Sequence, residues 1–469
     1  MPSANGKGEK ILLMRIVPET PLTIEEISRI TGSELKSEIP SETLINGITT
    51  DSREICGGDL FVTLKGERFD GEEFIENAKK CGAYVLSKNK DAHIVTEDTL
   101  LSLLNIASYY KKRLPKLKKT VAVTGSVGKT TTKNILSKIL SVNFKVHATK
   151  ENYNNFLGLS HTLLTAPKDT EILVAEVGMN HPGEIEILSK ALEPDVSIIT
   201  NIGTAHIGNL GSRELIAKAK LEILSGMIDK KITVPYEEPL LKDINCAYTV
   251  SITNPKANCY ISLKEENIHG SVFDIFTLKN YVSGARVSLP GRHVLSAIAH
   301  SIGAIELLGF DIKKLKDSLT VLDDNCVRGK IININGYKIF DDTYSSSPEA
   351  VIADFQLLSI RNIKKSCVLG DMLELGDSSE ELHRRVGKAV AEYGFRNLYT
   401  FGKSSSFIAE AALNAGMREE NVFINTDISA PEITAKQIIE TYTQDETILF
   451  KASHSIHAER IYEFLKQTT

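Results

Sequence analysis

The sequence predicts an α/β protein of three domains. A chain of 469 residues is too long for one hydrophobic core, and at roughly 150 residues per domain it suggests about three. From about residue 119 onward, apolar strand-like segments alternate with helical ones, as in parallel sheets covered on both faces. A glycine-rich loop follows the first of these strands. We place the domains at residues 21–118, 119–327 and 328–469.

Each region has its own pattern. The first begins with the helical spacing of Ile24, Ile27 and Ile30 and continues through short strands and turns. The central region alternates strands and helices, and its stretch from about 230 to 290 is richer in short strands and turn residues. In the third region, helical segments such as SSEELHRRVGKAVAEY separate the strand-like runs SCVLGD, NLYTFG, NVFIN and ETILFKAS. That order predicts a second α/β unit close to a Rossmann layout.

Composition excludes several classes of function. A net charge of −5 and the absence of Trp argue against nucleic-acid binding, which usually needs a basic face or stacking aromatics. No apolar run approaches the roughly 20 residues that span a bilayer, so we expect no membrane insertion. Six scattered cysteines without a CxxC pair indicate reduced, mostly buried thiols and a cytoplasmic protein. Residues 1 to about 20 are predicted to be a disordered extension, with Met14 as an alternative start.

The glycine-rich loop is a phosphate-binding loop. Its glycines let successive N–H groups face phosphate oxygens at a helix N-terminus, while a lysine reaches the terminal phosphates and a hydroxyl ligates Mg²⁺. Val123 stands where the longer pattern has glycine, so this is a shortened TGxxGKT form. The alternative is a glycine turn before a helix that binds no ligand. The loop predicts ATP binding by Gly125, Ser126, Val127, Gly128, Lys129, Thr130 and Thr131.

Several motifs, in the same order along the chain, resemble those of the Mur ligase family. The loop reads TGSVGKTTTK, and it is followed by KENYNNFLG, EVGMNH and NIGTAH. The run VLGDMLELG at 368–376, with EELH after it, is the most specific match and resembles the family members that add D-alanyl-D-alanine. Residues 50–53 and 58–62 resemble the family's uridine-nucleotide domain. The resemblance extends from about residue 21 to the end of the chain.

Three residues besides Thr130 are candidate metal ligands. Glu176 and His206 follow two strands of the central region, where the carboxyl ends of parallel strands face a nucleotide. The alternatives are a capping glutamate and a structural histidine. Lys220 lies in a helical stretch and would ordinarily be a solvated lysine. The resemblance implies that two Mg²⁺ ions bind here and that a lysine of this stretch carries a carbamate that ligates one of them. We assign the carbamate to Lys220 rather than Lys218, because Lys220 directly precedes the apolar continuation of the helix.

The resemblance also implies substrate contacts. Arg328 and Asp342 would join the ATP site, and Lys129, His206 and Lys220 would act in catalysis. Residues matching the family's substrate motifs are Ser52, Arg53, Asn154, Asn155, Lys451 and Ser453.

The sequence departs from the family's patterns at several positions. The substituted positions are Glu72, Val294, Ala297, Ser345, Ser347, Ala452 and His454. We expect the adenine contacts and the dipeptide pocket to differ in detail, whereas the phosphate and metal chemistry is retained.

The activity implied is ATP-dependent amide-bond formation. The substrates would be UDP-N-acetylmuramoyl-tripeptide and D-alanyl-D-alanine, joined by a monomer through an acyl phosphate. One alternative is a sister ligase that adds diaminopimelate or lysine to the UDP-linked dipeptide. The other is a nucleotide-binding protein without ligase activity, which the substituted motifs keep open.

Overall fold

A computed structural model describes residues 15–36, 39–66, 69–245, 247–312, 315–360 and 364–467. The chain divides into two compact units. Unit 1 comprises Met1–Thr124, Leu140–Ile198 and Ala219–Ile232, and unit 2 comprises Gly125–Ile139, Ile199–Lys218 and Thr233–Thr469. Elements cut by these bounds are described with the unit that holds most of their residues.

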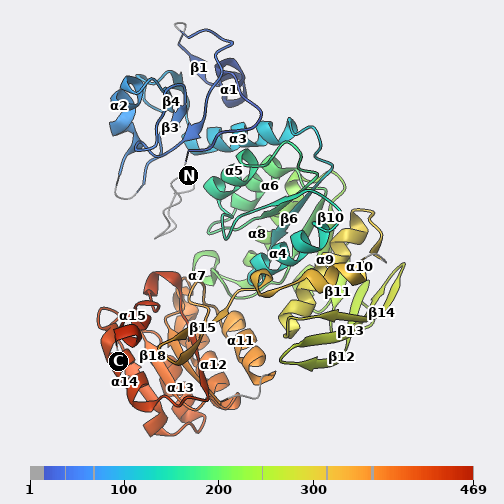
Figure 1. Cartoon of the computed structure of the whole chain (residues 1–469), viewed down its shortest axis with the longest axis vertical. Coiled ribbons are helices and arrows are strands. Elements are labelled where there is room, and N and C mark those ends of the chain that lie inside the picture. The colour runs from blue at the N-terminus through green and yellow to red at the C-terminus, as the bar shows by residue number, and fades with distance from the viewer. Residues whose placement is uncertain are drawn as a thin grey trace. The chain divides into compact units, whose positions relative to one another are not determined.

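The N-terminal part of unit 1 is a small α/β layer, drawn in blue in Figure 1. Its sheet has the order β1-β5-β4-β3-β2, parallel except where β1 meets β5. The predicted first helix is confirmed, because Thr23 and Glu26 form a capping box at its start and Gly32 ends it with φ 62°. The elements are β1 (Glu34–Leu35), β2 (Ile48–Thr49), β3 (Leu60–Val62), β4 (Tyr84–Ser87), β5 (Ile94–Val95), α1 (Ile24–Thr31), α2 (Ile75–Lys80) and α3 (Thr99–Lys112).

The rest of unit 1 contains the strand order β9-β6-β8-β7. The β6/β8 and β7/β8 pairs are parallel, and β8 is buried along its whole length. Near-continuous apolar strands of this kind belong to sheets covered on both faces, as the sequence predicted. The elements are β6 (Lys119–Thr124), β7 (Val146–Ala148), β8 (Ile172–Glu176), β9 (Val196–Ile199), α5 (Phe156–Leu164) and α6 (Glu184–Leu192).

Unit 2 begins with the phosphate loop at Gly125 and includes the strand order β14-β13-β12-β11-β10. The β12/β13 and β13/β14 pairs are antiparallel, so the sheet changes its pattern here. These strands, of 9, 8 and 7 residues, are longer than the short strands that the sequence predicted between 230 and 290. The elements are α4 (Lys129–Leu140), α7 (Ile207–Leu210), α8 (Arg213–Leu221), α9 (Arg292–Leu307), α10 (Leu315–Ser318), β10 (Lys231–Pro235), β11 (Ala247–Ser251), β12 (Cys259–Asn267), β13 (Gly270–Thr277) and β14 (Tyr281–Val287).

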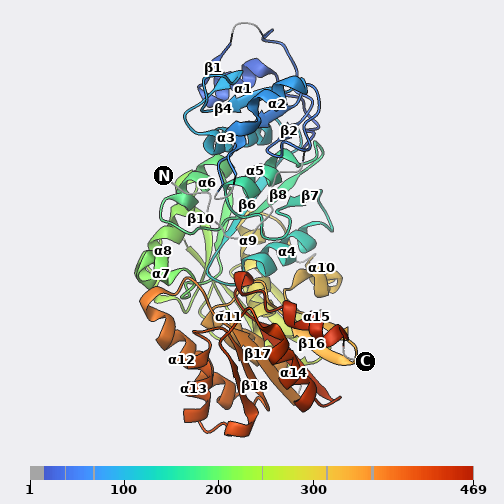
Figure 2. The same ribbon diagram turned by 90° about the vertical axis from the view of Figure 1, so that its left-hand side faces the viewer.

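The C-terminal part of unit 2 is a sheet with helices on both faces (Figure 2). Its order is β15-β16-β20-β17-β18-β19, parallel except for the β15/β16 pair. One core lies under α11 to α13 and a second under α14 and α15. The elements are β15 (Lys330–Ile334), β16 (Tyr337–Asp341), β17 (Lys364–Gly370), β18 (Leu398–Phe401), β19 (Val422–Asn425), β20 (Glu446–Lys451), α11 (Pro348–Ile360), α12 (Ser379–Glu392), α13 (Ser406–Asn414), α14 (Pro431–Thr441) and α15 (Arg460–Gln467).

The predicted three-domain α/β fold is therefore present, with one correction at its start. Residues 15–20 are not a disordered extension: Ile16 is buried and pairs with Ile48, and the Arg15 guanidinium holds the buried Asp59 carboxylate at 2.6 and 2.8 Å. Met14 lies outside the described residues. Among the helices that the structure describes, none is long and apolar enough to cross a membrane.

Candidate active site

The phosphate loop has the conformation that its glycines predict. Gly125 and Gly128 have φ of 147° and 79°, in the region that favours glycine. A Cβ on Gly125 would lie 1.8 Å from Thr200 Oγ1, so only glycine fits there. The Lys129 ammonium donates to the carbonyl oxygens of Gly125 (2.8 Å) and Ser126 (3.3 Å). The Lys129 side chain therefore folds back onto the loop that precedes it.

A second segment, at residues 200–204, braces this loop. Asn201 Oδ1 accepts from the backbone N–H groups of Ser126 and Val127, both at 3.0 Å. The backbone N–H of Gly203 donates to Ser126 Oγ at 2.9 Å. Asn201 begins the NIGTAH motif, but no role was predicted for it from the sequence. These contacts set the loop's shape before any nucleotide binds.

Arg328 lies beside the phosphate loop. Its Nη2 donates to Thr130 Oγ1 at 2.7 Å, and its guanidinium carbon lies 4.7 Å from the centre of the Tyr344 ring. Stacking on an aromatic face holds a guanidinium in one orientation. The structure thus brings two predicted ATP-site residues, Thr130 and Arg328, into direct contact.

Within unit 1, Glu176 is a fully buried carboxylate at the end of β8. It pairs in register with Val123, two residues before Gly125 in the chain. Asn154, predicted to bind substrate, donates its amide to Glu176 Oε1 at 2.8 Å. Carboxylate oxygens are the ligands that Mg²⁺ prefers, so the chemistry of this residue fits a cation.

Lys220 belongs to the same unit as Glu176 and is only 2% exposed, whereas Lys218 is exposed. The structure thus rules out the alternative that Lys220 is a solvated surface lysine. A buried position fits the predicted role as a metal ligand better than a solvated one does.

His206 contacts the third region. Its backbone has φ 65°, and its Nδ1 lies 2.5 Å from Glu374 Oε2. The approach is close but is not that of an aligned hydrogen bond. Within the described ranges, no three His, Cys, Asp or Glu side chains gather into a metal-holding group. The predicted ligand set contains only two residues of those types, Glu176 and His206.

Lys451 is buried at the end of β20, where it contacts two carboxylates. It bonds with Asp342 and lies 3.0 Å from Asp354. Burial raises the pKa of Asp354 to about 7, against the opposing pull of Lys451. Burial alone would lower the pKa of Lys451, but the two carboxylates outweigh it and raise that pKa. Asp354 was not predicted from the sequence.

The remaining predicted substrate residues have local partners. Asn155 caps α5 by accepting from the Gly158 N–H at 2.9 Å, and Ser453 Oγ accepts from the Leu373 N–H at 2.9 Å. Ser52 is half-buried, and the exposed Arg53 pairs with Asp51 at 2.5 Å. Arg53 and Asn155 are thus the exposed members of this group.

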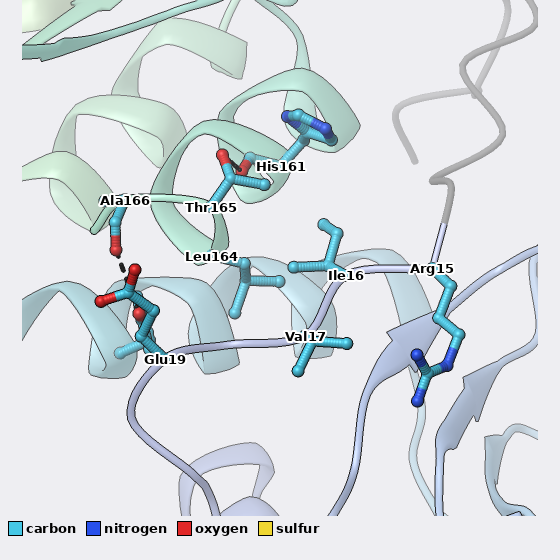
Figure 3. A pocket seen from close by; sticks show the side chains of 9 residues that line it. Arg15, Ile16, Val17, Glu19, His161, Leu164, Thr165 and Ala166 are labelled. Carbon is cyan, nitrogen blue, oxygen red and sulfur yellow. Dashed lines mark hydrogen bonds between the residues drawn. The ribbon is translucent and has the colours of Figure 1, made fainter. Parts of the chain in front are cut away.

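Two further features bear on the predicted site. Val294 and Ala297, at substituted family positions, are buried on α9 and pack in the core. A cavity of about 330 Å³ in unit 1 lies against residues 15–19 and α5 (Figure 3), and its lining contains none of the predicted site residues.

Comparison with known proteins identifies the family. Residues 44–127 match the model described as Mur ligase family, catalytic domain; residues 123–305 match Mur ligase middle domain; and residues 327–454 match Mur ligase, glutamate ligase domain. The chain belongs to the Mur ligase family. The phosphate loop lies where the first two of these matches meet.

Curated Mur ligases resemble this chain over nearly their whole length. UDP-N-acetylmuramoyl-tripeptide--D-alanyl-D-alanine ligase of Bacillus subtilis (strain 168) is 35% identical over 94% of this chain and 98% of its own. The Escherichia coli (strain K12) protein of the same name is 30% identical over 95% of this chain and 98% of its own.

Solved structures agree in fold. MurF from Acinetobacter baumannii superposes with a TM-score of 0.85 at 29% identity, over 96% of this chain and all of the other. MurF ligase from Thermotoga maritima in complex with ADP gives a TM-score of 0.77 at 28% identity, over 90% of this chain and 97% of the other.

Proposed function

We propose that this Mur ligase joins D-alanyl-D-alanine to UDP-N-acetylmuramoyl-tripeptide with ATP hydrolysis, in peptidoglycan precursor synthesis. The near full-length similarity to ligases of that name carries the proposal. The braced phosphate loop supports the use of ATP, as does the ADP complex of the Thermotoga maritima ligase. We expect a cytoplasmic monomer.

The reaction divides into two transfers. The free carboxylate of the UDP-linked tripeptide attacks the γ-phosphate of ATP, which gives an acyl phosphate and ADP. The amine of D-alanyl-D-alanine then attacks the acyl carbon, and phosphate leaves as the amide forms. Both reactants of the first step are anionic, so charge neutralisation and alignment dominate the catalysis.

Residues of this chain provide that neutralisation. Lys129 would turn from the loop carbonyls it now contacts to the γ-phosphate. Arg328, already beside Thr130, would neutralise the neighbouring phosphate oxygens. Thr130, Glu176, His206 and a carbamylated Lys220 would hold two Mg²⁺ ions, which supply charge neutralisation and alignment of the phosphates when bound.

Substrate contacts follow from position and exposure. Ser52 and the exposed Arg53 would contact the UDP moiety, and Asn154 would connect the precursor to Glu176. Lys451 is buried, so we assign it and Ser453 an indirect role, in which they hold Asp342 and the 370–376 loop behind the dipeptide site. Asp342 would reach the nucleotide.

The alternatives have weaker support. A diaminopimelate-adding ligase has a similar fold, but its solved structure is only 16% identical to this chain and supports the fold alone. ADP release from the purified protein separates the hypotheses: we expect it only with ATP, UDP-tripeptide and D-alanyl-D-alanine together. Release with UDP-dipeptide and diaminopimelate instead would favour the sister ligase, and no release with any pair would favour a binding protein.

A further inference from the structure

The loop at residues 370–376 is the most family-specific segment of the sequence, yet the chemistry above leaves it without a direct role. It follows β17 and is fixed by three hydrogen bonds to other parts of unit 2. Asp371 accepts from the Ser405 N–H at 2.7 Å, and His383 Nε2 accepts from the Met372 N–H at 3.0 Å. Ser453 Oγ accepts from the Leu373 N–H. The loop is therefore held rigidly up to Glu374.

This loop packs against the segment that follows Asn201. The Gly208 N–H donates to the Glu374 carbonyl oxygen at 2.8 Å. A Cβ on Gly208 would lie 2.4 Å from the Gly376 nitrogen, and a Cβ on Gly376 would lie 2.7 Å from the Gly208 Cα. The two backbone segments thus pack directly against each other at Gly208 and Gly376, and neither position tolerates a side chain.

The contact brings Glu374 to His206. Both residues have left-handed backbones, with φ of 63° and 65°, a conformation that such residues rarely adopt. In this conformation the Glu374 carboxylate lies 2.5 Å from His206 Nδ1. A second carboxylate, Glu349, accepts from Thr204 Oγ1 at 3.0 Å and braces the same segment.

We propose that Glu374 is a positioning residue for His206. The Glu374 carboxylate, placed beside Nδ1 by the backbone contact of the two segments, fixes the orientation of the imidazole ring and leaves Nε2 as the nitrogen for a cation. Metal-ligating histidines are commonly oriented by such a partner, whose loss costs about 10–100-fold in metal affinity. This inference rests on the proposed metal role of His206. It also gives the 370–376 loop a function, because the loop would couple the C-terminal region to the nucleotide site.

Mn²⁺ binding tests this without the acceptor substrates. Mn²⁺ is titrated into the protein by electron paramagnetic resonance, in the presence of a non-hydrolysable ATP analogue. We expect Glu374→Gln to weaken one Mn²⁺ site about 10-fold or more. Asp377→Asn, the same charge change at the exposed position directly after the loop, should leave the affinity unchanged.

A double variant separates positioning from a general structural effect. In a His206→Ala background, Glu374→Gln should have no further effect on Mn²⁺ affinity, because its target is gone. Unchanged Mn²⁺ binding in Glu374→Gln, or equal additive losses in the double variant, would overturn the inference. The titration needs only nucleotide and Mn²⁺, so its outcome is independent of the ligase assay. A failure of the ligase assay would count against the proposed function and not against this inference.

Discussion

Replacing Lys451 by methionine removes the buried ammonium that Asp342 and Asp354 share. Methionine has a similar length and is apolar, so the change leaves two largely buried carboxylates, each 13% exposed, without their counter-ion. Breaking a buried ion pair by removing one partner typically costs about 3–5 kcal/mol. Lys451 is 1% exposed, so water offers little compensation and we expect a loss within that range at pH 8.

The loss should depend on pH. Burial raises the pKa of Asp354 to about 7 in the folded chain, well above its unfolded value. A carboxyl with a raised folded pKa binds its proton more tightly when folded, so its contribution to stability falls as pH rises toward 7. Without Lys451 that pKa rises further, because the lowering interaction is gone. The deficit of the variant should therefore be smaller at pH 5.5 than at pH 8.

Urea unfolding followed by circular dichroism measures both effects, since the chain has no Trp for fluorescence. The double variant Lys451→Met, Asp354→Asn should recover part of the stability at pH 8, because one buried charge is removed. A Lys451→Met protein within about 0.5 kcal/mol of the parent at pH 8 would refute the reasoning, as that is the range of ordinary surface substitutions. An equal deficit at both pH values would refute the assignment to Asp354.

Two predictions concern catalysis. Lys129→Ala should lower turnover by on the order of 10²–10³ with an unchanged circular dichroism spectrum, because its charge acts on the γ-phosphate; near-normal turnover would move the nucleotide site elsewhere. Lys220→Arg should fail as badly as Lys220→Ala at saturating Mg²⁺, because a guanidinium cannot form a carbamate. Lys218→Arg, at the exposed neighbouring position, is the control, and normal turnover in Lys220→Arg would exclude the carbamate.

Local patterns in the sequence predicted the elements that depend on local physics. Glycine spacing predicted the loop whose φ values require glycine at 125 and 128. The apolar pattern of the helix favoured Lys220 over Lys218, and the structure buries the first and exposes the second. Periodicity likewise predicted α1.

Contacts between distant segments left no such signal. Asp354 reaches Lys451 from 97 positions earlier in the chain, and no periodicity links the two. Lys451 was predicted to contact a substrate because it matches a motif of the family, but the two carboxylates allow it to be buried. Residues 15–20 were predicted to be part of a disordered extension, but Arg15 pairs with Asp59, 44 positions later in the chain.

An isotope experiment tests the central claim most directly. The UDP-tripeptide is labelled with ¹⁸O in the free carboxylate at the peptide terminus and incubated with ATP, Mg²⁺ and D-alanyl-D-alanine. An acyl phosphate leaves one carboxylate oxygen on the departing phosphate, so mass spectrometry should find one ¹⁸O per phosphate released and one pentapeptide product per ADP. Unlabelled phosphate, or product formed only from UDP-dipeptide and diaminopimelate, would contradict the account.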